Sequence, residues 1–190
     1  ITLSASSKNH INALEINNDI DMDENPVSIK SEFLISLFDQ LLKSNDSRLG
    51  GGVGAKDKSI IDRCAIKVYG EYLSGKSEYM PTLVDFRNEL LRQPEDEAQD
   101  LALSLEIFTT GSLDAFAHQS DVNVNNRIVA YDILELGEQM KSIGLLIMLD
   151  NIFNRVMANR KRGKYTRVYV DEAHLYFKNP YSADFLLKCW

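Results

Sequence analysis

Two carboxylates stand side by side at Asp171 and Glu172, directly after the β-forming run of residues 167–170. Adjacent acids that leave a strand can divide the work of phosphoryl transfer, because one faces the metal ion while its neighbour reaches the nucleophilic water. The pattern is typical of the acidic half of a nucleoside triphosphate site. The alternative is a strand end whose acids are solvated or cap the next helix. Asp132 also ends a predicted strand, and we interpret it as a structural residue that bonds to loop N–H groups.

Such a site also needs a loop that holds phosphates, and Gly70–Ser77 matches the pattern G-x-x-x-x-G-K-[ST]. The pattern binds phosphate where a strand leads into the loop and a helix starts at the lysine. Here an apolar stripe at helical spacing continues through Tyr72 and Leu73. Pro81 would also interrupt the second turn of the required helix. The match therefore lacks the structural context that the chemistry requires.

We instead predict that a helix runs to about Ser74 and that Gly75 ends it, with Lys76 near the negative end of the helix dipole. Gly70 inside that helix costs about 1 kcal/mol relative to alanine, which keeps the phosphate-loop alternative open.

The elements that must position these residues fall into two kinds. Residues 26 to about 110 are predicted to be nearly all helical, because Pro26 opens a helix and apolar residues then recur at helical spacing. A glycine-rich loop, with four glycines from Gly50 to Gly54, interrupts this block. The predicted helices cover residues 26–42, 60–74, 82–93 and 98–108.

After Gly111 the pattern changes. Residues 127–133 are rich in β-formers and apolar on both faces, as is typical of a strand buried in a parallel sheet. Residues 138–162 form a long predicted helix that Gly163 ends, and residues 168–170 form the next strand. These elements predict one β-α-β unit with a right-handed crossover. Asp171 and Glu172 would then lie at the carboxyl edge of its sheet, where ligands bind.

Several segments together resemble the motor domain of the TrbE/TraC-type conjugation ATPases of type IV secretion systems. They are SASSKNHINALEIN, IIDRCAIKVY with MPTLVDFRNELLRQ, and NNRIVAYDILELGEQMKSIGLLIMLDNIFNRVMANRKRGKYTRVYVDEAHLYF. The resemblance covers nearly the whole chain and is strongest from Asn126 to Phe177. The DEAH letters alone are weak evidence, because several helicase and translocase families share them.

The resemblance implies an α/β fold, namely part of a RecA-like P-loop ATPase core with a parallel sheet and an inserted all-helical sub-domain. The chain would divide into a first strand and loop (residues 1–25), the inserted helices (26–110) and a β-α-β part of the core with the Walker B strand (111–190). The family's phosphate loop would precede Ile1. We therefore expect a fragment that is inactive by itself, cut from an ATPase.

The resemblance also implies roles and partners. Asp171 would hold Mg²⁺ through water and contact the nucleotide, Glu172 would polarise the attacking water, and His174 would help to sense the γ-phosphate. ATP and Mg²⁺ would be the cofactors. The parent protein would form a hexameric ring, meet components of the secretion channel with DNA as a further partner, and lie in the cytoplasm at the inner face of the membrane. Two alternatives stay open: a non-catalytic helical interaction module, and a related DNA translocase or helicase.

Composition narrows these classes. The 190 residues carry a net charge of -7, which argues against a chain that coats nucleic acid non-specifically. A basic cluster at residues 160–167 could touch nucleic acid or a neighbouring subunit, although cations at a helix carboxyl end are favoured by the dipole in any case. Cys64 and Cys189 fit no metal or redox spacing. No apolar run is long enough to span a bilayer. His10 and Asn12 fall in a predicted polar loop and receive no role.

Overall fold

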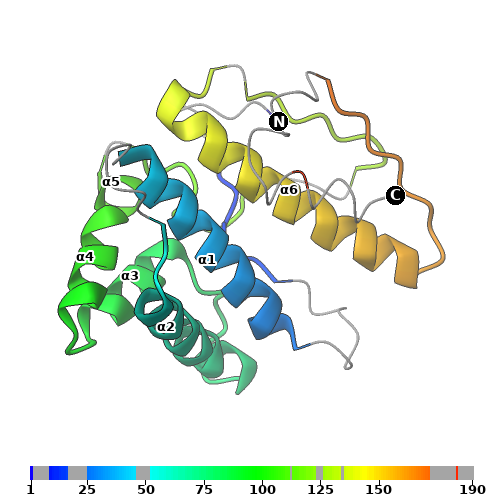
Figure 1. Cartoon of the computed structure of the whole chain (residues 1–190). Helices are drawn as coiled ribbons and strands as arrows, with labels where there is room; N and C mark the ends of the chain where they lie inside the picture. Colours follow the sequence, from blue (N-terminus) through cyan, green and yellow to red (C-terminus); the bar gives the residue numbers. More distant parts are fainter. Residues whose placement is uncertain are drawn as a thin grey trace.

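The computed structural model describes residues 1, 9–16, 25–45, 52–111, 113–122, 126–133, 135–171 and 183. The regular structure of these residues is helical and comprises six helices (Figure 1). They are α1 (Pro26–Asn45), α2 (Ala55–Leu73), α3 (Leu83–Leu91), α4 (Asp96–Ser104), α5 (Glu106–Thr109) and α6 (Glu138–Lys161). Helix α1 packs against α2 and α4 on one side and against α6 on the other.

The helices begin where the sequence signals indicate. Pro26 opens α1, and the side-chain oxygen of Asn25 accepts a hydrogen bond from the Val27 N–H at 3.0 Å. At the start of α2 the Gly54 N–H donates to the Asp57 carboxylate at 2.8 Å. The helices predicted at residues 26–42 and 82–93 are therefore confirmed, and the helix predicted at 60–74 is confirmed except that it begins earlier, at Ala55. The segment predicted as one helix at 98–108 is divided between α4 and α5.

One main hydrophobic core, with a smaller cluster on α6, runs through the described residues. The rings of Phe38 on α1 and Phe86 on α3 lie 6.0 Å apart between centroids, a contact typical of aromatic packing. Apolar side chains from α1, α2, α3, α6 and the segment of residues 9–16 reach this core, among them Ile11, Leu14, Phe33, Leu37, Ile61, Tyr69, Leu90 and Leu146. The division into parts at residues 25 and 110 stays a prediction.

The predicted parallel sheet is wrong. Among the described residues no strand ladder forms, and Asp132 carries an isolated β-bridge. The amino group of Ile1 donates to the Ala130 carbonyl at 2.8 Å, and the Asp132 N–H donates to the Ile1 carbonyl at 2.8 Å. Residues 168–170, predicted as the second strand, form no regular structure. The partial RecA-like α/β fold is thus replaced by a helical one.

Burial explains this difference. A strand of a parallel sheet is covered on both faces, but Ile128 is 86% exposed and Tyr169 is 87% exposed. The two segments lie instead along one side of α6, where Tyr131, Ile133 and Val170 pack against a small cluster of Leu145, Met148 and Leu149. A run of β-branched and aromatic residues fits any half-buried surface, and here a helix supplies that surface.

Helix α6 confirms the predicted long helix, and Gly163 follows it with φ +65°, the conformation expected of a helix-ending glycine. Gly144 allows a close approach within the core, since an added Cβ would lie 2.6 Å from a methyl carbon of Leu136 and 3.3 Å from the Phe116 ring. Within the described ranges, none of the helices combines the length and the apolar character needed to cross a membrane.

Candidate functional site

The predicted acidic site falls at the end of the described chain. Asp171 is exposed and follows the extended segment of residues 164–170 that leaves α6. Glu172 and His174 lie outside the described residues. Within the described residues, no group of three or more His, Cys, Asp or Glu side chains could hold a metal ion. The structure therefore places one carboxylate of the predicted pair and does not test the constellation.

The phosphate-loop match at Gly70–Ser77 is the carboxyl end of α2. Gly75 has φ +72°, and its N–H donates to the Tyr72 carbonyl at 3.0 Å. The N–H groups of Lys76 and Ser77 both donate to the Glu71 carbonyl, at 3.0 and 3.2 Å. This arrangement closes the helix at a left-handed glycine. The predicted helix end at Gly75 is confirmed.

That geometry leaves nothing with which to hold a phosphate. A phosphate loop presents free N–H groups at the positive end of a helix. In residues 75–77 the backbone N–H groups already donate to carbonyls of α2. The loop also lies at the negative end of the helix dipole, which disfavours an anion. Lys76 is exposed and follows this helix end.

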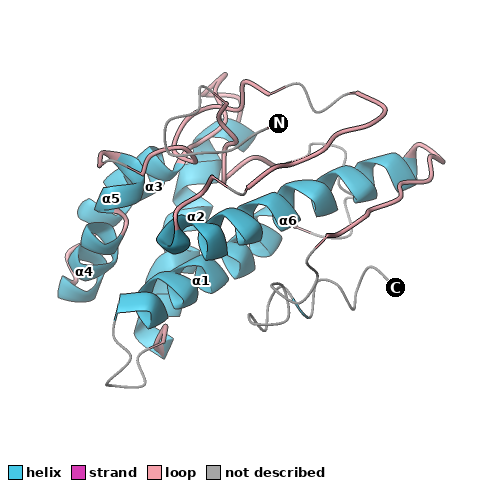
Figure 2. Ribbon diagram, turned by 90° about the horizontal axis from the view of Figure 1, so that it is seen from above, coloured by secondary structure: helices cyan, strands magenta, loops and turns pink. Residues whose placement is uncertain are grey.

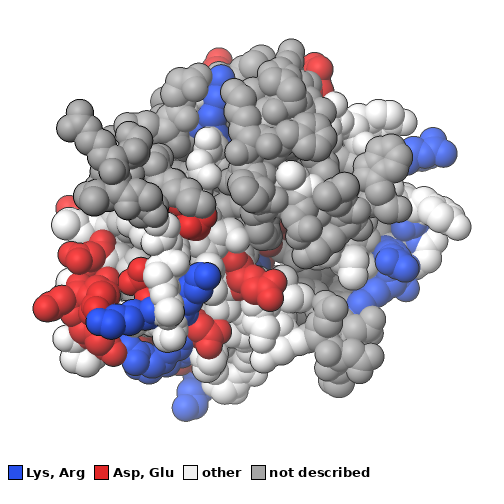
Figure 3. All heavy atoms as spheres, in the orientation of Figure 1, with Lys and Arg blue, Asp and Glu red and all other residues white. Residues whose placement is uncertain are grey.

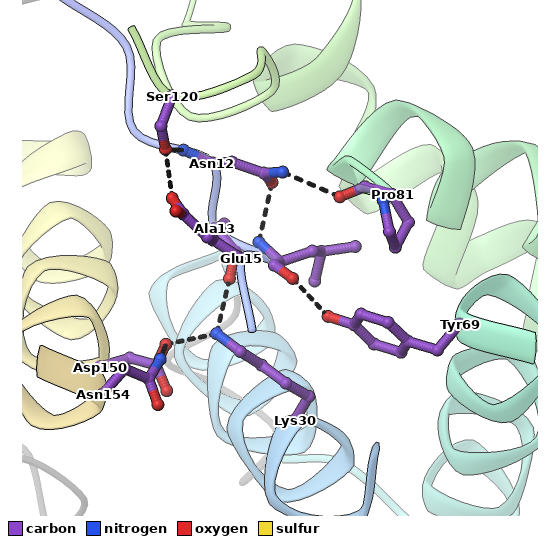
Figure 4. Close-up of polar contacts among 10 residues, drawn as sticks. Asn12, Ala13, Glu15, Lys30, Tyr69, Pro81, Ser120, Asp150 and Asn154 are labelled. Atoms are coloured by element: carbon purple, nitrogen blue, oxygen red, sulfur yellow. Dashed lines mark hydrogen bonds and ion pairs between the residues drawn. The ribbon is translucent and has the colours of Figure 1, made fainter. Parts of the chain in front are cut away.

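An extensive polar site in the described residues surrounds residues 9–16, whose backbone bonds to side chains of α1 and α2 (Figure 4). Asn12 is 3% exposed and donates from its amide nitrogen to the Pro81 carbonyl at 2.9 Å. Its amide oxygen accepts from the Leu14 N–H at 2.9 Å, and its own N–H donates to the Ser120 hydroxyl at 2.9 Å. The Tyr69 hydroxyl donates to the Leu14 carbonyl at 2.7 Å. Asn12 lies in a loop, as predicted, but its side chain is buried and hydrogen-bonded, a structural role that the sequence did not suggest.

A buried ion pair joins this segment to two helices. The Lys30 ammonium on α1 contacts the Asp150 carboxylate on α6 and donates to the Ala13 carbonyl at 3.2 Å (Figure 4). The Asn154 amide donates to the same carboxylate at 3.1 Å, and the Lys30 ammonium lies 4.8 Å from the centre of the Phe33 ring. The Lys30 and Asp150 side chains are 2% and 6% exposed.

Burial and hydrogen bonding indicate a structural role for this network. Burial raises the pKa of the Asp150 carboxyl, an effect that the neighbouring Lys30 ammonium opposes. Burial also raises the pKa of the Tyr69 hydroxyl well above its ordinary value. Because these groups bond to each other and to backbone, and because water cannot reach them, they position elements instead of reacting.

Sequence reasoning missed the network, although a signal was present. Asn12 is flanked by Ile11, Ala13 and Leu14, and a polar residue inside a short apolar run is buried only when it has partners. Its partners Pro81 and Ser120 lie far away in the sequence, so their identity could not be inferred from the sequence alone.

Two further groups are accessible. A hollow of about 370 Å³ between α2 and α3 is lined by Lys67, Glu71, Tyr79, Asp85 and Arg92 among others, a mixture of both charges. The His10 ring lies 2.9 Å from the Asp121 carboxylate and packs edge-on against the His118 ring at 4.6 Å. Cys64 is buried, which raises its thiol pKa to about 11 and argues against a reactive role.

The exposed end of α6 forms the remaining candidate. We call it the α6 basic surface and define it as Arg160, Lys161, Arg162, Lys164 and Arg167 with Tyr165 and Tyr169. All seven residues are exposed. In Figure 3 basic side chains without acidic ones among them lie on the right, where α6 ends, whereas acidic and basic side chains are mixed at the lower left over the other helices.

Comparison with known proteins identified no relative of this chain. No family model, no curated protein and no solved structure matches it.

Proposed function

We propose that the chain is part of a conjugation ATPase of the TrbE/TraC type, a motor that hydrolyses ATP to drive DNA or protein transfer or assembly of a type IV secretion channel. The observation that carries the proposal is the order of sequence features from Asn126 to Phe177, which ends in the adjacent acids Asp171 and Glu172. The helical block from α1 to α5 supports it, because the family carries a helical insertion at this place. The helix end at Gly75 supports it as well, since the resemblance assigns no phosphate to that loop.

The resemblance supplies the roles of the site residues. Asp171 would hold Mg²⁺ through water, Glu172 would polarise the attacking water, and His174 would help to sense the γ-phosphate. The described residues fit the ATP–Mg²⁺ group only in part: Asp171 is an accessible carboxylate, but the single phosphate-loop match uses its N–H groups within α2. The proposal therefore requires a phosphate-binding loop outside the described residues, and we derive no catalytic step from them.

The test is ATP turnover and Mg²⁺-dependent ATP binding by the full-length protein in which this sequence is encoded. We expect Glu172→Gln to abolish turnover and to leave binding intact, because the amide keeps the shape of the carboxylate but cannot act as a base. Asp171→Asn should weaken the Mg²⁺ dependence of both.

Matched controls come from the rejected loop. Lys76→Ala and Gly70→Ala should leave turnover unchanged, since an added Cβ at Gly70 meets nothing within 4 Å. Loss of ATP binding in the Lys76 variant would instead restore that loop as the phosphate site. Unaltered turnover in the Glu172 variant would remove the proposal.

The same proposal places the parent protein in a hexameric ring in the cytoplasm, peripheral to the membrane and in contact with channel components. Light scattering of the full-length protein with and without nucleotide measures the ring. A monomer under both conditions would contradict the hexameric ring. It would leave the proposed ATP hydrolysis untested by that measurement and still open to the turnover assay.

A second candidate is a non-catalytic helical interaction module, and a specific observation favours it. All the regular structure of the described residues is helical, and its one extensive polar site is buried and structural. In that case the full-length protein would neither bind nor hydrolyse ATP, and the Glu172 substitution would change nothing measurable.

A further inference from the structure

The segment that follows α6 presents its aromatic side chains to solvent. Tyr165 is 101% exposed and Tyr169 is 87% exposed, although tyrosine is a residue that usually covers apolar surface. Lys164 and Arg167 stand between and beside them and are also exposed. In residues 164–169 the exposed cations and rings therefore follow one another in the order Lys, Tyr, Arg, Tyr, with Thr166 and Val168 between them.

Two contacts with α6 hold the segment of residues 164–170 in place. The Thr166 hydroxyl accepts a hydrogen bond from the Asn159 amide at 2.9 Å, and Val170 packs against the apolar cluster on α6. Figures 1 and 2 both show the segment running back along α6 after the turn at Gly163. Tyr165, Arg167 and Tyr169 stand at alternate positions and are exposed, whereas Thr166 and Val170 are partly buried, a pattern that fits an extended chain with one face in water. In such a chain the two rings would lie roughly 13 Å apart.

The helix dipole explains part of the charge and not the rest. Arg160 and Lys161 lie in the last turn of α6, where cations are favoured. Arg167 lies well beyond the helix end, outside the range of that effect. The net charge of the chain is -7, so a concentration of cations here runs against the composition of the molecule.

We propose that the α6 basic surface binds single-stranded nucleic acid. Its cations would contact backbone phosphates, and Tyr165 and Tyr169 would stack on unpaired bases, which is the combination that sequence-tolerant single-strand binders use. A duplex hides its base faces and so gains the charge contacts without the stacking. Neither interaction involves the 2′-hydroxyl, so single-stranded DNA and RNA should bind alike.

This inference goes beyond the proposed ATPase and does not rest on it. Binding needs no nucleotide and none of the residues assigned to ATP. A protein that never hydrolyses ATP could therefore bind nucleic acid at the α6 basic surface. A protein that hydrolyses ATP could equally lack that binding.

The test is fluorescence anisotropy of a labelled thymidine oligonucleotide of about 20 nucleotides titrated with the 190-residue chain without ATP. We expect Tyr165→Ala and Tyr169→Ala each to weaken binding about 5- to 100-fold, and Tyr→Phe at either position to preserve it. The logarithm of the binding constant falls as the logarithm of the salt concentration rises. The double variant Lys164→Ala/Arg167→Ala should make this negative slope shallower by about 1.4.

The controls are Tyr79→Ala, an exposed tyrosine in the connection between α2 and α3, and Lys58→Ala, an exposed lysine on α2. Neither should change the affinity. Since every substituted side chain is exposed, circular dichroism should show unchanged helix content for all variants.

Three results would overturn the proposal. They are no binding by the parent chain at about 50 mM salt, equal loss in the Tyr79 or Lys58 control, and equal affinity for duplex and single strand with no effect of the tyrosine variants. The last result would mean that the surface attracts any polyanion. Glu172→Gln should leave oligonucleotide binding unchanged, which separates this outcome from a failure of the proposed ATPase.

Discussion

Residues 9–16 and the two segments on α6, residues 126–133 and 164–170, are alike in backbone and opposite in burial. Both regions run without regular secondary structure against helices. In the interior segment Asn12 is 3% exposed, whereas on the outer side Ile128 is 86% exposed. The amide is inside and the aliphatic side chain is outside.

The difference teaches that partners decide burial here more than side-chain polarity does. Each hydrogen-bonding group of the Asn12 side chain finds a backbone group of opposite kind, so its burial leaves nothing unsatisfied. The outer segments have few apolar neighbours beyond the cluster on α6, and their side chains on the far face stay in water. Four predictions would break or sharpen this comparison.

The largest effect should come from the buried ion pair. Asp150→Ala leaves the Lys30 ammonium buried without its carboxylate, and we expect the free energy of unfolding to fall by about 3 to 5 kcal/mol. The double variant Lys30→Met/Asp150→Leu should recover most of that loss, because apolar residues of similar size remove the unpaired charge. Urea unfolding followed by circular dichroism measures both.

The exposed pair Lys56–Glu97 provides the control. Glu97→Ala should leave the urea midpoint where it is, because exposed pairs are screened by solvent. If Asp150→Ala behaves like Glu97→Ala, the interior does not hold the pair as described.

The second effect concerns Asn12. Asn12→Ala leaves the Pro81 carbonyl and the Leu14 N–H buried without partners, and we expect a loss of about 2 kcal/mol or more in unfolding free energy. Asn88→Ala, at an exposed position of α3, is the matched control and should be neutral or slightly stabilising, because alanine favours the helix. Equal results for the two variants would place Asn12 outside the core.

These two sites show what could be predicted from the sequence and what could not. Periodicity and end signals located the long helices to within a few residues, because helices depend on contacts three and four residues apart. The position of Asn12 and the pairing of Lys30 with Asp150 depend on contacts more than a hundred residues apart, which a single sequence does not reveal.

The predicted sheet failed for a related reason. An apolar run predicts a covered segment without saying what covers it, and α6 took the place of strand neighbours. Of the predicted site, the helix end at Gly75 is local and was predictable. The constellation of Asp171, Glu172 and His174 depends on long-range assembly and stays a prediction.

A smaller effect concerns pH. The backbone N–H of His10 donates to the Asp121 carboxylate at 2.7 Å and its ring lies 2.9 Å from it, and these bonds hold the pKa of Asp121 below its ordinary value. A lowered folded-state pKa means that the unfolded chain binds the proton more readily. The stabilisation is therefore present above the ordinary carboxyl pKa and is lost as the pH falls through the folded-state value.

We expect Asp121→Asn to reduce the acid-induced decrease of the urea midpoint without changing the interior network. The measurement is the midpoint across the acidic range, with Asp100→Asn, an exposed aspartate on α4, as the control. An unchanged acid profile in the Asp121 variant would mean that His10 does not hold this carboxylate in solution.

The smallest effect should come from Ile128, and it tests the comparison most directly. At 86% exposure Ile128→Ala removes almost no buried surface, so the unfolding free energy should change by no more than about 0.5 kcal/mol. Ile11→Ala is the matched interior variant. At 0% exposure it should cost about 2 to 5 kcal/mol, because the lost methyl groups leave a cavity. A strand buried in a parallel sheet would make both isoleucines costly to replace. A large loss at Ile128 would therefore show that its segment is covered in solution, and it would end the contrast between the two regions.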